Sequence, residues 1–357
     1  MIGLYCPDIP PEPGGVSDHT LMLARALADL GARPVVLAER GDPTLFEPLV
    51  AQTGLKPGDV AAAAKRHGIT SLVVQYVPFL FARRGVSPAL MRAIYRLHRA
   101  GIRIAVVVHE AYVPWTRLPW LVTGLPQRIQ FAYLVRSAVQ VYAPLPKYAD
   151  IARRFAGKAT RVQVAPIGAT IPASRLTREE ARERLRLADG QVAISIFSPA
   201  ASGFAHDWIA AAARKLAGHP SVVWVRFGFG SMRPLPGYPE GANVIILGER
   251  SATDAAATMR AMDIAAAPYT DGLTMRRSGA MLALEHGVAT VSSEGHLFDP
   301  SLRALADCAA SADAFANRIA RLVDSPAERA AVAKKAAGYA AQASIESLAA
   351  RMVKDLG

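Results

Sequence analysis

Short, continuous runs of Val, Ile and Ala recur along this chain, and segments with helical spacing separate them. The runs include SLVVQY at 71–76, RIAVVV at 103–108, VAISIF at 192–197 and VVWVRF at 222–227. A strand with one face in water alternates apolar and polar residues, whereas an unbroken apolar run indicates a strand covered on both faces. The repeated order of strand, helix and strand is the βαβ unit, whose strands run parallel. The sequence therefore predicts an α/β fold with two doubly wound, Rossmann-like parallel sheets.

The length of 357 residues favours two domains over one. The strand–helix pattern runs through one round, stops at the segment PIGATIP (166–172), and resumes after a polar helix expected over 178–187. We therefore expect a first domain over 1–167 and a second over 168–340. A final helix within 341–357 is expected to pack back on the first domain.

The positive charge is concentrated in the front half of the chain. The net charge is +12, and the residues through Arg161 hold 20 Lys and Arg against 10 Asp and Glu, whereas the remainder holds 21 against 19. This asymmetry favours an acidic partner such as an anionic membrane surface or a phosphorylated acceptor, although a merely soluble basic surface is equally compatible. No nucleic-acid module accompanies the charge, so nucleic acid is not an expected partner.

Several features point to a cytoplasmic protein, with peripheral contact at the inner face of the membrane left open. No apolar run approaches the roughly 18 residues of a membrane-spanning helix, and the start MIGLYCPDIPP lacks a signal-peptide pattern. Two cysteines, Cys6 and Cys308, are far apart in the chain, which predicts neither a disulfide framework nor a metal cluster.

The stretch PYTDGLTMRRSGAMLALEHGVATVSSEG (268–295) is the most informative for function. We interpret it as a strand end, an Asp271-Gly272 turn, a helix capped by Thr274 and ended at Gly287, and a second strand. The pair Arg276-Arg277 would lie in the first helical turn, where cations oppose the helix dipole. Such a placement predicts a bound anion, and a solvated or salt-bridged arginine pair is the alternative.

Two loops of the first half are also candidates for binding. Gly14-Gly15 stands between a strand expected over 2–6 and a helix expected over 18–30, where backbone amides come close to a ligand, although G-x-G-x-x-G is absent. The loop at 112–128 contains Trp115 and Trp120, flanked by Arg117 and Arg128. It suits a membrane interface or an acceptor cleft, and equally a packed structural loop.

Five segments in this order resemble the GT-B glycosyltransferases, specifically family 4, across nearly the whole chain. They are Pro13-Gly14-Gly15 with the helix LMLARALADLG, His109-Glu110, Ala165-Pro166-Ile167-Gly168, SVVWVRFGFG, and DIAAAPYTDGLTMRRSGAMLALEHGVATVSS. The resemblance implies two Rossmann-like domains facing across a cleft. It also implies retaining transfer of a sugar from a nucleotide-sugar donor to a hydroxyl acceptor. The acceptor would be a glycan, a lipid-linked molecule or a small molecule.

The chain departs from the family pattern at the donor site. The signature has two Glu residues separated by seven positions, but here Asp271 stands first, Gly279 takes the second place, and Glu285 comes later. The Arg/Lys pair expected after the strand at 192–197 is also missing. We therefore expect Arg276 or Arg277 to supply that charge, with one of them on phosphate and the other on a carboxylate.

The resemblance and the residues together give a set of expected roles. Helix amides at 273–275, Gly14-Gly15 and an arginine would stabilise the departing diphosphate. His109 would orient the sugar or acceptor, Phe229 would pack on the nucleobase, and Ser202-Gly203 would approach phosphate. The donor-binding residues are Gly14, Gly15, Ser202, Gly203, Phe229, Gly272, Leu273, Thr274, Met275, Arg276, Arg277, Ser278 and Glu285, and the catalytic residues are His109, Glu110 and Asp271.

No cofactor and no metal are expected, because the chain contains no D-x-D pair to hold a divalent cation. Two other functions remain open. The same fold serves hydrolysis or epimerisation of a nucleotide sugar, and the altered signature is compatible with a non-catalytic subunit that binds a partner or a membrane surface.

Overall fold

The computed structural model describes the chain except residues 13, 114–117, 167–170, 172, 202 and 239–241, and except the side chains of 118–122 and 337–343. The described chain divides into two compact units. Unit 1 comprises Met1–Ile167 and Ile345–Gly357, and unit 2 comprises Gly168–Ser344.

Unit 1 is built on a seven-stranded sheet in the order β3-β2-β1-β4-β5-β6-β7, and every pair of neighbouring strands is parallel. Its strands are β1 (Ile2–Tyr5), β2 (Val35–Leu37), β3 (Val50–Gln52), β4 (Ser71–Tyr76), β5 (Arg103–Val108), β6 (Gln140–Ala143) and β7 (Arg161–Val164). Its α-helices are α1 (Gly15–Asp29), α2 (Val60–Arg66), α3 (Pro78–Phe81), α4 (Pro88–Arg99), α5 (Leu118–Ser137), α6 (Pro146–Phe155) and α13 (Ile345–Leu356).

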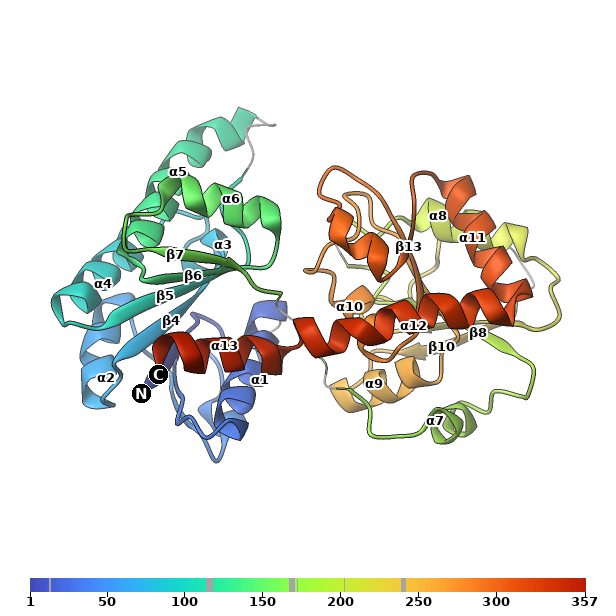
Figure 1. Ribbon diagram of the computed structural model, residues 1–357, viewed down its shortest axis with the longest axis horizontal. Helices are drawn as coiled ribbons and strands as arrows, with labels where there is room; N and C mark the ends of the chain where they lie inside the picture. Colours follow the sequence, from blue (N-terminus) through green and yellow to red (C-terminus); the bar gives the residue numbers. More distant parts are fainter. Residues whose placement is uncertain (13, 114–117, 167–170, 172, 202, 239–241) are drawn as a thin grey trace. The chain divides into compact units, whose positions relative to one another are not determined.

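Helices cover both faces of this sheet (Figure 1). One face packs on α2, α4, α5 and α6, and the other packs on α1 and α13. The terminal helix α13 is held by hydrogen bonds at its carboxyl end and by apolar packing along one face. The Leu356 carbonyl accepts hydrogen bonds from Ser71 Oγ at 3.0 Å and from Arg103 Nη2 at 2.6 Å, both on strands of unit 1. The last residues of the chain therefore contribute to the core of unit 1.

Unit 2 contains a six-stranded parallel sheet in the order β10-β9-β8-β11-β12-β13. Its strands are β8 (Val192–Phe197), β9 (Val222–Phe227), β10 (Val244–Gly248), β11 (Ile264–Ala267), β12 (Ala289–Ser293) and β13 (Asp307–Ala309). Its α-helices are α7 (Arg178–Arg184), α8 (His206–Lys215), α9 (Ala252–Arg260), α10 (Ser278–Glu285), α11 (Ala312–Asp324) and α12 (Pro326–Ala343). One 3₁₀ turn of unit 2 lies at Pro300–Ala304, and two 3₁₀ turns of unit 1 lie at Pro43–Phe46 and Pro57–Asp59.

Helix α10 is the central helix of unit 2, because it contributes to the cores on both sides of its axis. Ala280, Met281 and Leu284 join the cluster formed with α8, α11 and α12, whereas Leu282 and Ala283 join the cluster formed with α7 and α9. The carboxyl edge of the sheet lies at one end of this helix. Packing in both core clusters thus fixes the position of α10 and of the 268–295 stretch that contains it.

The predicted doubly wound α/β fold is confirmed, but two strands were not predicted and two helices begin earlier than predicted. The strands β3 and β13 were missed, because each has only three residues at a sheet edge and the first is only partly buried. Helix α1 begins at Gly15, three residues earlier than expected, with its first bond from the Asp18 amide to the Gly14 carbonyl. Helix α5 begins at Leu118 and contains Pro126, so the expected loop is helical from residue 118 onward.

Candidate functional site

A pocket of about 160 Å³ opens at the carboxyl edge of the sheet of unit 2. Ligands of parallel α/β sheets bind at this edge. Its lining comes from the residues after β8, the residue Tyr269 after β11, and the start of α10. The lining residues are Phe197, Ser198, Ala201, Tyr269, Arg276, Arg277, Ser278 and Gly279.

Arg277 is held on three sides in this pocket. Its guanidinium forms an ion pair with Asp271 and lies over the Tyr269 ring, 4.5 Å from the ring centre. A side chain at Gly203 would place its Cβ 2.9 Å from Arg277 Nη2, so the loop after β8 passes directly over the guanidinium. The expectation that one of the two arginines pairs with a carboxylate is met by Arg277 and Asp271.

Tyr269 contributes an apolar ring and a neutral hydroxyl. Burial raises the pKa of Tyr269 to about 12 against the opposing effects of Arg277 and the Ala280 amide, so the hydroxyl keeps its proton at neutral pH. The Ala280 amide donates a hydrogen bond to this hydroxyl and thereby links the first turn of α10 to the end of β11. The sequence reasoning missed Tyr269, although it directly follows a buried strand.

The two arginines precede α10 rather than forming its first turn, which corrects the expected helix start. Arg277 is the N-cap residue, and the first helical bond runs from the Met281 amide to the Arg277 carbonyl. Thr274 does not cap the helix. Its hydroxyl accepts the Arg276 amide, and its carbonyl accepts the Arg277 amide at 3.0 Å, which closes a tight turn before the helix.

The amides at 273–275 do not form the expected helical anion site. The Leu273 amide donates to the Ser293 carbonyl at 2.9 Å, and the Leu273 side chain is fully buried. Met275 packs against the same core cluster. The helix starts three residues later than Met275, at Ser278. The amides at the true amino end of α10 therefore belong to Ser278 and Gly279, both of which line the pocket.

Two glycines hold the turn after β11 in place. Gly272 has a φ of +92°, and a Cβ on it would lie 2.6 Å from the Gly295 amide nitrogen. A Cβ on Gly295 would lie 2.4 Å from the Asp271 carbonyl carbon, so the two loops cross without room for side chains. This crossing fixes the backbone of Asp271 and hence the ion pair with Arg277.

Ser198 connects the pocket to the glycine loop after β9. It has a φ of +47°, a conformation that L-residues rarely adopt, and strained residues of this kind cluster at functional sites. Its hydroxyl accepts the Phe229 amide at 3.3 Å. Phe229 itself is 54% exposed, and the Arg233 guanidinium lies 5.8 Å from its ring centre. No sequence motif indicated Ser198.

Of the predicted donor residues that the structure describes, Arg276, Arg277 and Ser278 line this pocket. Glu285 is the last residue of α10, whereas the pocket lies at the first residues of that helix. Ser202 lies outside the described residues, although Gly203 beside it contacts Arg277.

In unit 1, polar side chains gather at the carboxyl ends of β4 and β5. His109 directly follows β5 and is buried, and its Nε2 lies 2.7 Å from Oε1 of Gln75, which is on β4. An amide oxygen only accepts, so His109 Nε2 carries the hydrogen. The ring of His19, on α1, packs edge-on against His109 with centres 5.0 Å apart. The sequence reasoning missed both His19 and Gln75.

The glycine pair of unit 1 lies at the start of α1. Gly14 is the N-cap and Gly15 the first residue, and a Cβ on either would meet nothing within 4 Å. Contacts within the described residues therefore do not explain why glycine stands there. Glu110 is half-buried beside His109.

Some residues of the expected acceptor loop and of two other predicted motifs lie outside the described part of the chain. Pro13, Trp115, Arg117 and the Ile167-Gly168 pair lie outside the described residues, as does the side chain of Trp120. Arg128 lies over the Tyr112 ring at 4.2 Å and donates to the Gly124 carbonyl, so it stiffens the described end of that segment.

Among the described residues, no group of three or more His, Cys, Asp and Glu side chains is placed to hold a metal ion. Within the same residues, no helix is both long and apolar enough to cross a membrane.

No family model and no curated protein sequence matches the chain. Solved structures match it at low identity. A glycosyltransferase of Rickettsia africae has a TM-score of 0.70 at 12% identity, over 99% of this chain and 96% of that one. Anabaena HepE in complex with UDP and glucose has a TM-score of 0.66 at 15% identity, over 99% of both chains.

The same architecture occurs in a Listeria monocytogenes protein assigned as a UDP-N-acetylglucosamine 2-epimerase. Its TM-score is 0.61 at 10% identity, over 99% of this chain and 94% of that one. At such identities the similarity establishes the architecture and not the reaction. The two parallel sheets with their covering helices match the architecture of the GT-B glycosyltransferase structures.

Proposed function

We propose that this protein is a retaining, metal-independent glycosyltransferase, in which unit 2 binds a nucleotide-sugar donor and unit 1 binds a hydroxyl acceptor. The observation that carries the proposal is the pocket of unit 2, where Arg276, Arg277 and the start of α10 meet at the carboxyl edge of a parallel sheet. Cationic side chains and first-turn amides together suit a diphosphate. The UDP and UDP-glucose complexes of HepE make uracil the first nucleobase to test.

The proposed chemistry uses the positive charge of this pocket. As the bond between the sugar and the diphosphate breaks, negative charge grows on the leaving oxygen. Arg276 and the amides of Ser278 and Gly279 would stabilise that charge, because they are positioned before the reaction begins. The acceptor oxygen then bonds to the sugar carbon on the side that the diphosphate leaves, and its proton passes to the departing phosphate oxygen.

Arg277 and Asp271 would have a different role. Because the Asp271 carboxylate already neutralises Arg277, this pair presents a fixed dipole rather than a free charge. We propose that the pair positions Arg277 against Tyr269 and leaves Arg276 as the main cation for the phosphates. His109, oriented by Gln75, would hydrogen-bond the sugar or the acceptor, with Glu110 nearby.

Gly14 and Gly15 are proposed to let the donor come close to the backbone at the start of α1. The open space around their Cα atoms is available to a ligand, and a glycine pair permits contact with the backbone. Phe229, more than half exposed at the glycine loop after β9, is proposed to stack on the nucleobase.

The deciding experiment is thermal unfolding against UDP, GDP, ADP, TDP and their sugars without added metal. A ligand at about 100 times its Kd adds roughly 2.7 kcal/mol to the free energy of unfolding, which raises Tm by several degrees. Arg276→Gln should abolish the shift, whereas Arg250→Gln, an exposed arginine of unit 2 outside this pocket, should preserve it.

If none of these ligands raises the Tm of the folded protein, the donor site is refuted and the non-catalytic subunit is favoured. Products formed without an acceptor would instead identify a hydrolase or an epimerase. Retention would be read from the anomeric configuration of the transferred sugar.

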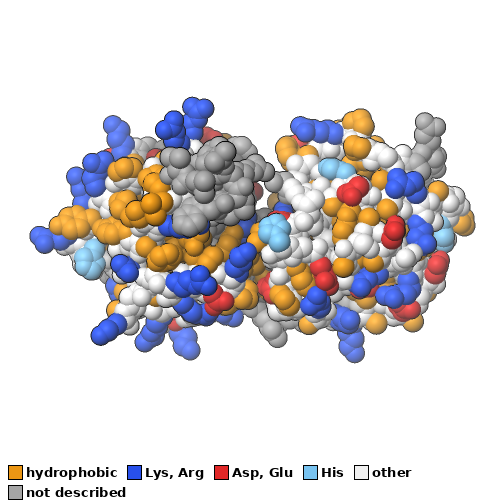
Figure 2. Space-filling model, turned by 90° about the horizontal axis from the view of Figure 1, so that it is seen from above, with side chains coloured by type: hydrophobic (Ala, Val, Ile, Leu, Met, Phe, Trp, Pro, Cys, Tyr) orange, Lys and Arg blue, Asp and Glu red, His pale blue; other side chains and the backbone are white. Residues whose placement is uncertain are grey.

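An anionic membrane surface is the proposed location of the acceptor. Tyr95 on α4 and both Leu125 and Ile129 on α5 are 55–56% exposed, on helices that contact each other. Figure 2 shows apolar side chains among Lys and Arg side chains over unit 1. Binding to anionic vesicles should therefore weaken in Leu125→Ser/Ile129→Ser, and no binding by the parent protein would exclude this location.

A further inference from the structure

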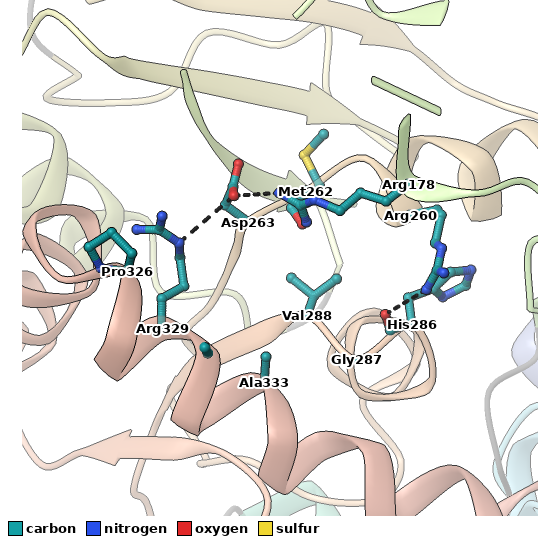
Figure 3. A pocket seen from close by; sticks show the side chains of 11 residues that line it. Arg178, Arg260, Met262, Asp263, His286, Gly287, Val288, Pro326, Arg329 and Ala333 are labelled. Carbon is teal, nitrogen blue, oxygen red and sulfur yellow. Dashed lines mark hydrogen bonds and ion pairs between the residues drawn. The ribbon is translucent and has the colours of Figure 1, made fainter. Parts of the chain in front are cut away.

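A second and larger pocket lies at the opposite, amino edge of the sheet of unit 2. Its volume is about 360 Å³, and it opens where the chain enters β11 and β12 (Figure 3). Helix α12 forms one wall, and the ends of α9 and α10 form the other. The lining residues are Arg178, Arg260, Met262, Asp263, His286, Gly287, Val288, Pro326, Arg329, Ala330 and Ala333.

The lining of this pocket carries excess positive charge. Asp263 is its single carboxylate, and it pairs with Arg178 at 2.5 Å and with Arg329 at 3.8 Å. Arg182, outside the lining, also reaches it at 3.0 Å. Three guanidinium groups and one carboxylate give the lining a net charge of +2. In Figure 3 the arginines approach the hollow from different walls, with Asp263 between Arg178 and Arg329.

His286 adds no charge, because both of its ring nitrogens are engaged in the neutral form. Nδ1 donates to the Leu282 carbonyl at 2.8 Å, and Nε2 accepts the Ser174 amide at 2.9 Å. Burial and the nearby Arg260 hold the pKa of His286 below its ordinary value. The positive charge of the pocket thus comes from arginine and persists at any physiological pH.

The Arg260 guanidinium has an N–H donor that no described residue accepts. Its Nη1 donates to the His286 carbonyl over 3.4 Å, and its buried Nε makes no hydrogen bond to any residue that the structure describes. Arg329, in contrast, donates to the Leu322 and Val323 carbonyls as well as approaching Asp263. A guanidinium offers five donors in a planar fork that matches phosphate oxygens.

We propose that this pocket is a second anion site of unit 2, which binds a phosphate dianion through Arg260 with Arg178 and Arg329. The chemical class is inorganic phosphate or a small phosphate monoester, and the pocket volume leaves room for an organic group beyond the phosphate. The site lies at the carboxyl end of α10, whereas the proposed donor pocket lies at its amino end. The proposal does not depend on the transferase function.

The test is calorimetric titration of the full chain with inorganic phosphate and with glycerol 3-phosphate at matched ionic strength. Arg260→Gln should weaken phosphate binding about tenfold or more, because hydrogen bonds between charged groups are lost. Lys335→Gln, an exposed cation of α12 outside the lining, should change it less than about twofold. Arg276→Gln, at the other pocket, should also leave it unchanged.

Tighter binding of the monoester would identify an organic phosphate as the occupant, and equal or tighter binding of the free ion would identify inorganic phosphate. Arg260→Lys keeps the charge and should lose less affinity than Arg260→Gln, so it provides a second variant if the first fails to fold. Absence of phosphate binding, an equal loss in Lys335→Gln, or a loss confined to Arg276→Gln would each overturn the proposal.

Discussion

The ion pair between Asp271 and Arg277 allows a quantitative test of how the donor pocket works. Their side chains are 24% and 16% exposed, so solvent screens the pair only in part. In the parent protein the two charges cancel. Arg277→Gln removes the cation and leaves a carboxylate beside the pocket, whereas Asp271→Asn leaves the cation and removes the carboxylate.

The expected size of the effect follows from Coulomb's law. A unit charge about 8 Å from a phosphate charge contributes roughly 1–2 kcal/mol at an effective dielectric of about 20–40. That corresponds to about 5- to 30-fold in Kd. We therefore expect UDP to bind more weakly to Arg277→Gln by at least this factor and more tightly to Asp271→Asn by a similar one.

The double variant distinguishes charge from structure. Asp271→Asn/Arg277→Gln restores neutrality, so its affinity for UDP should recover about 5- to 30-fold relative to Arg277→Gln alone. Calorimetric titration with UDP measures each affinity, and circular dichroism confirms that each variant is folded. If Asp271→Asn weakens UDP binding as much as Arg277→Gln does, the pair acts by holding the turn and the charge reasoning is refuted.

Three further predictions concern the pocket, unit 1 and pH. Gly279→Val should abolish UDP binding with little change in fold, because a Cβ at 279 would come within 2.7 Å of the Phe197 ring and push it into the pocket, as titration would show. Met352→Ala, in the buried face of α13, should lower the free energy of unfolding by about 2–5 kcal/mol, measured by urea denaturation. Because burial lowers the pKa of His286, unfolded chains bind more protons, so stability should fall as the pH drops below about 6.5, and His286→Gln should flatten this slope.

Local sequence determined the interior of both sheets. The strands β4, β8, β9 and β11 have the predicted bounds, because each is a mainly apolar run without the alternation of a half-exposed strand. Gly287, with a φ of +66°, stands at the C′ position of α10 as its residue type predicts. The edge strands β3 and β13 were missed, because three residues are too few to show a pattern, whereas the longer edge strands β7 and β10 were predicted.

The sequence located the donor pocket of unit 2 but did not predict how its residues are arranged. Its arginines were identified from the order of turn and helix. Their position before α10 depends on the crossing of Gly272 with Gly295 and on the ion pair with Asp271, which involve loops brought together by the sheet. Ser198 and Tyr269 follow different strands, and nothing in their neighbouring residues marks them.

Sequence alone thus specified the interior strands, most of the helices and the cations near a helix start, because burial patterns and turn residues are local. Only the tertiary structure decided that His109 meets Gln75 and His19, and that Arg178, Arg260 and Arg329 converge near one carboxylate. Parallel sheets bring the ends of distant strands side by side. The chemistry of a site therefore comes from residues whose separation along the chain carries no signal of their contact.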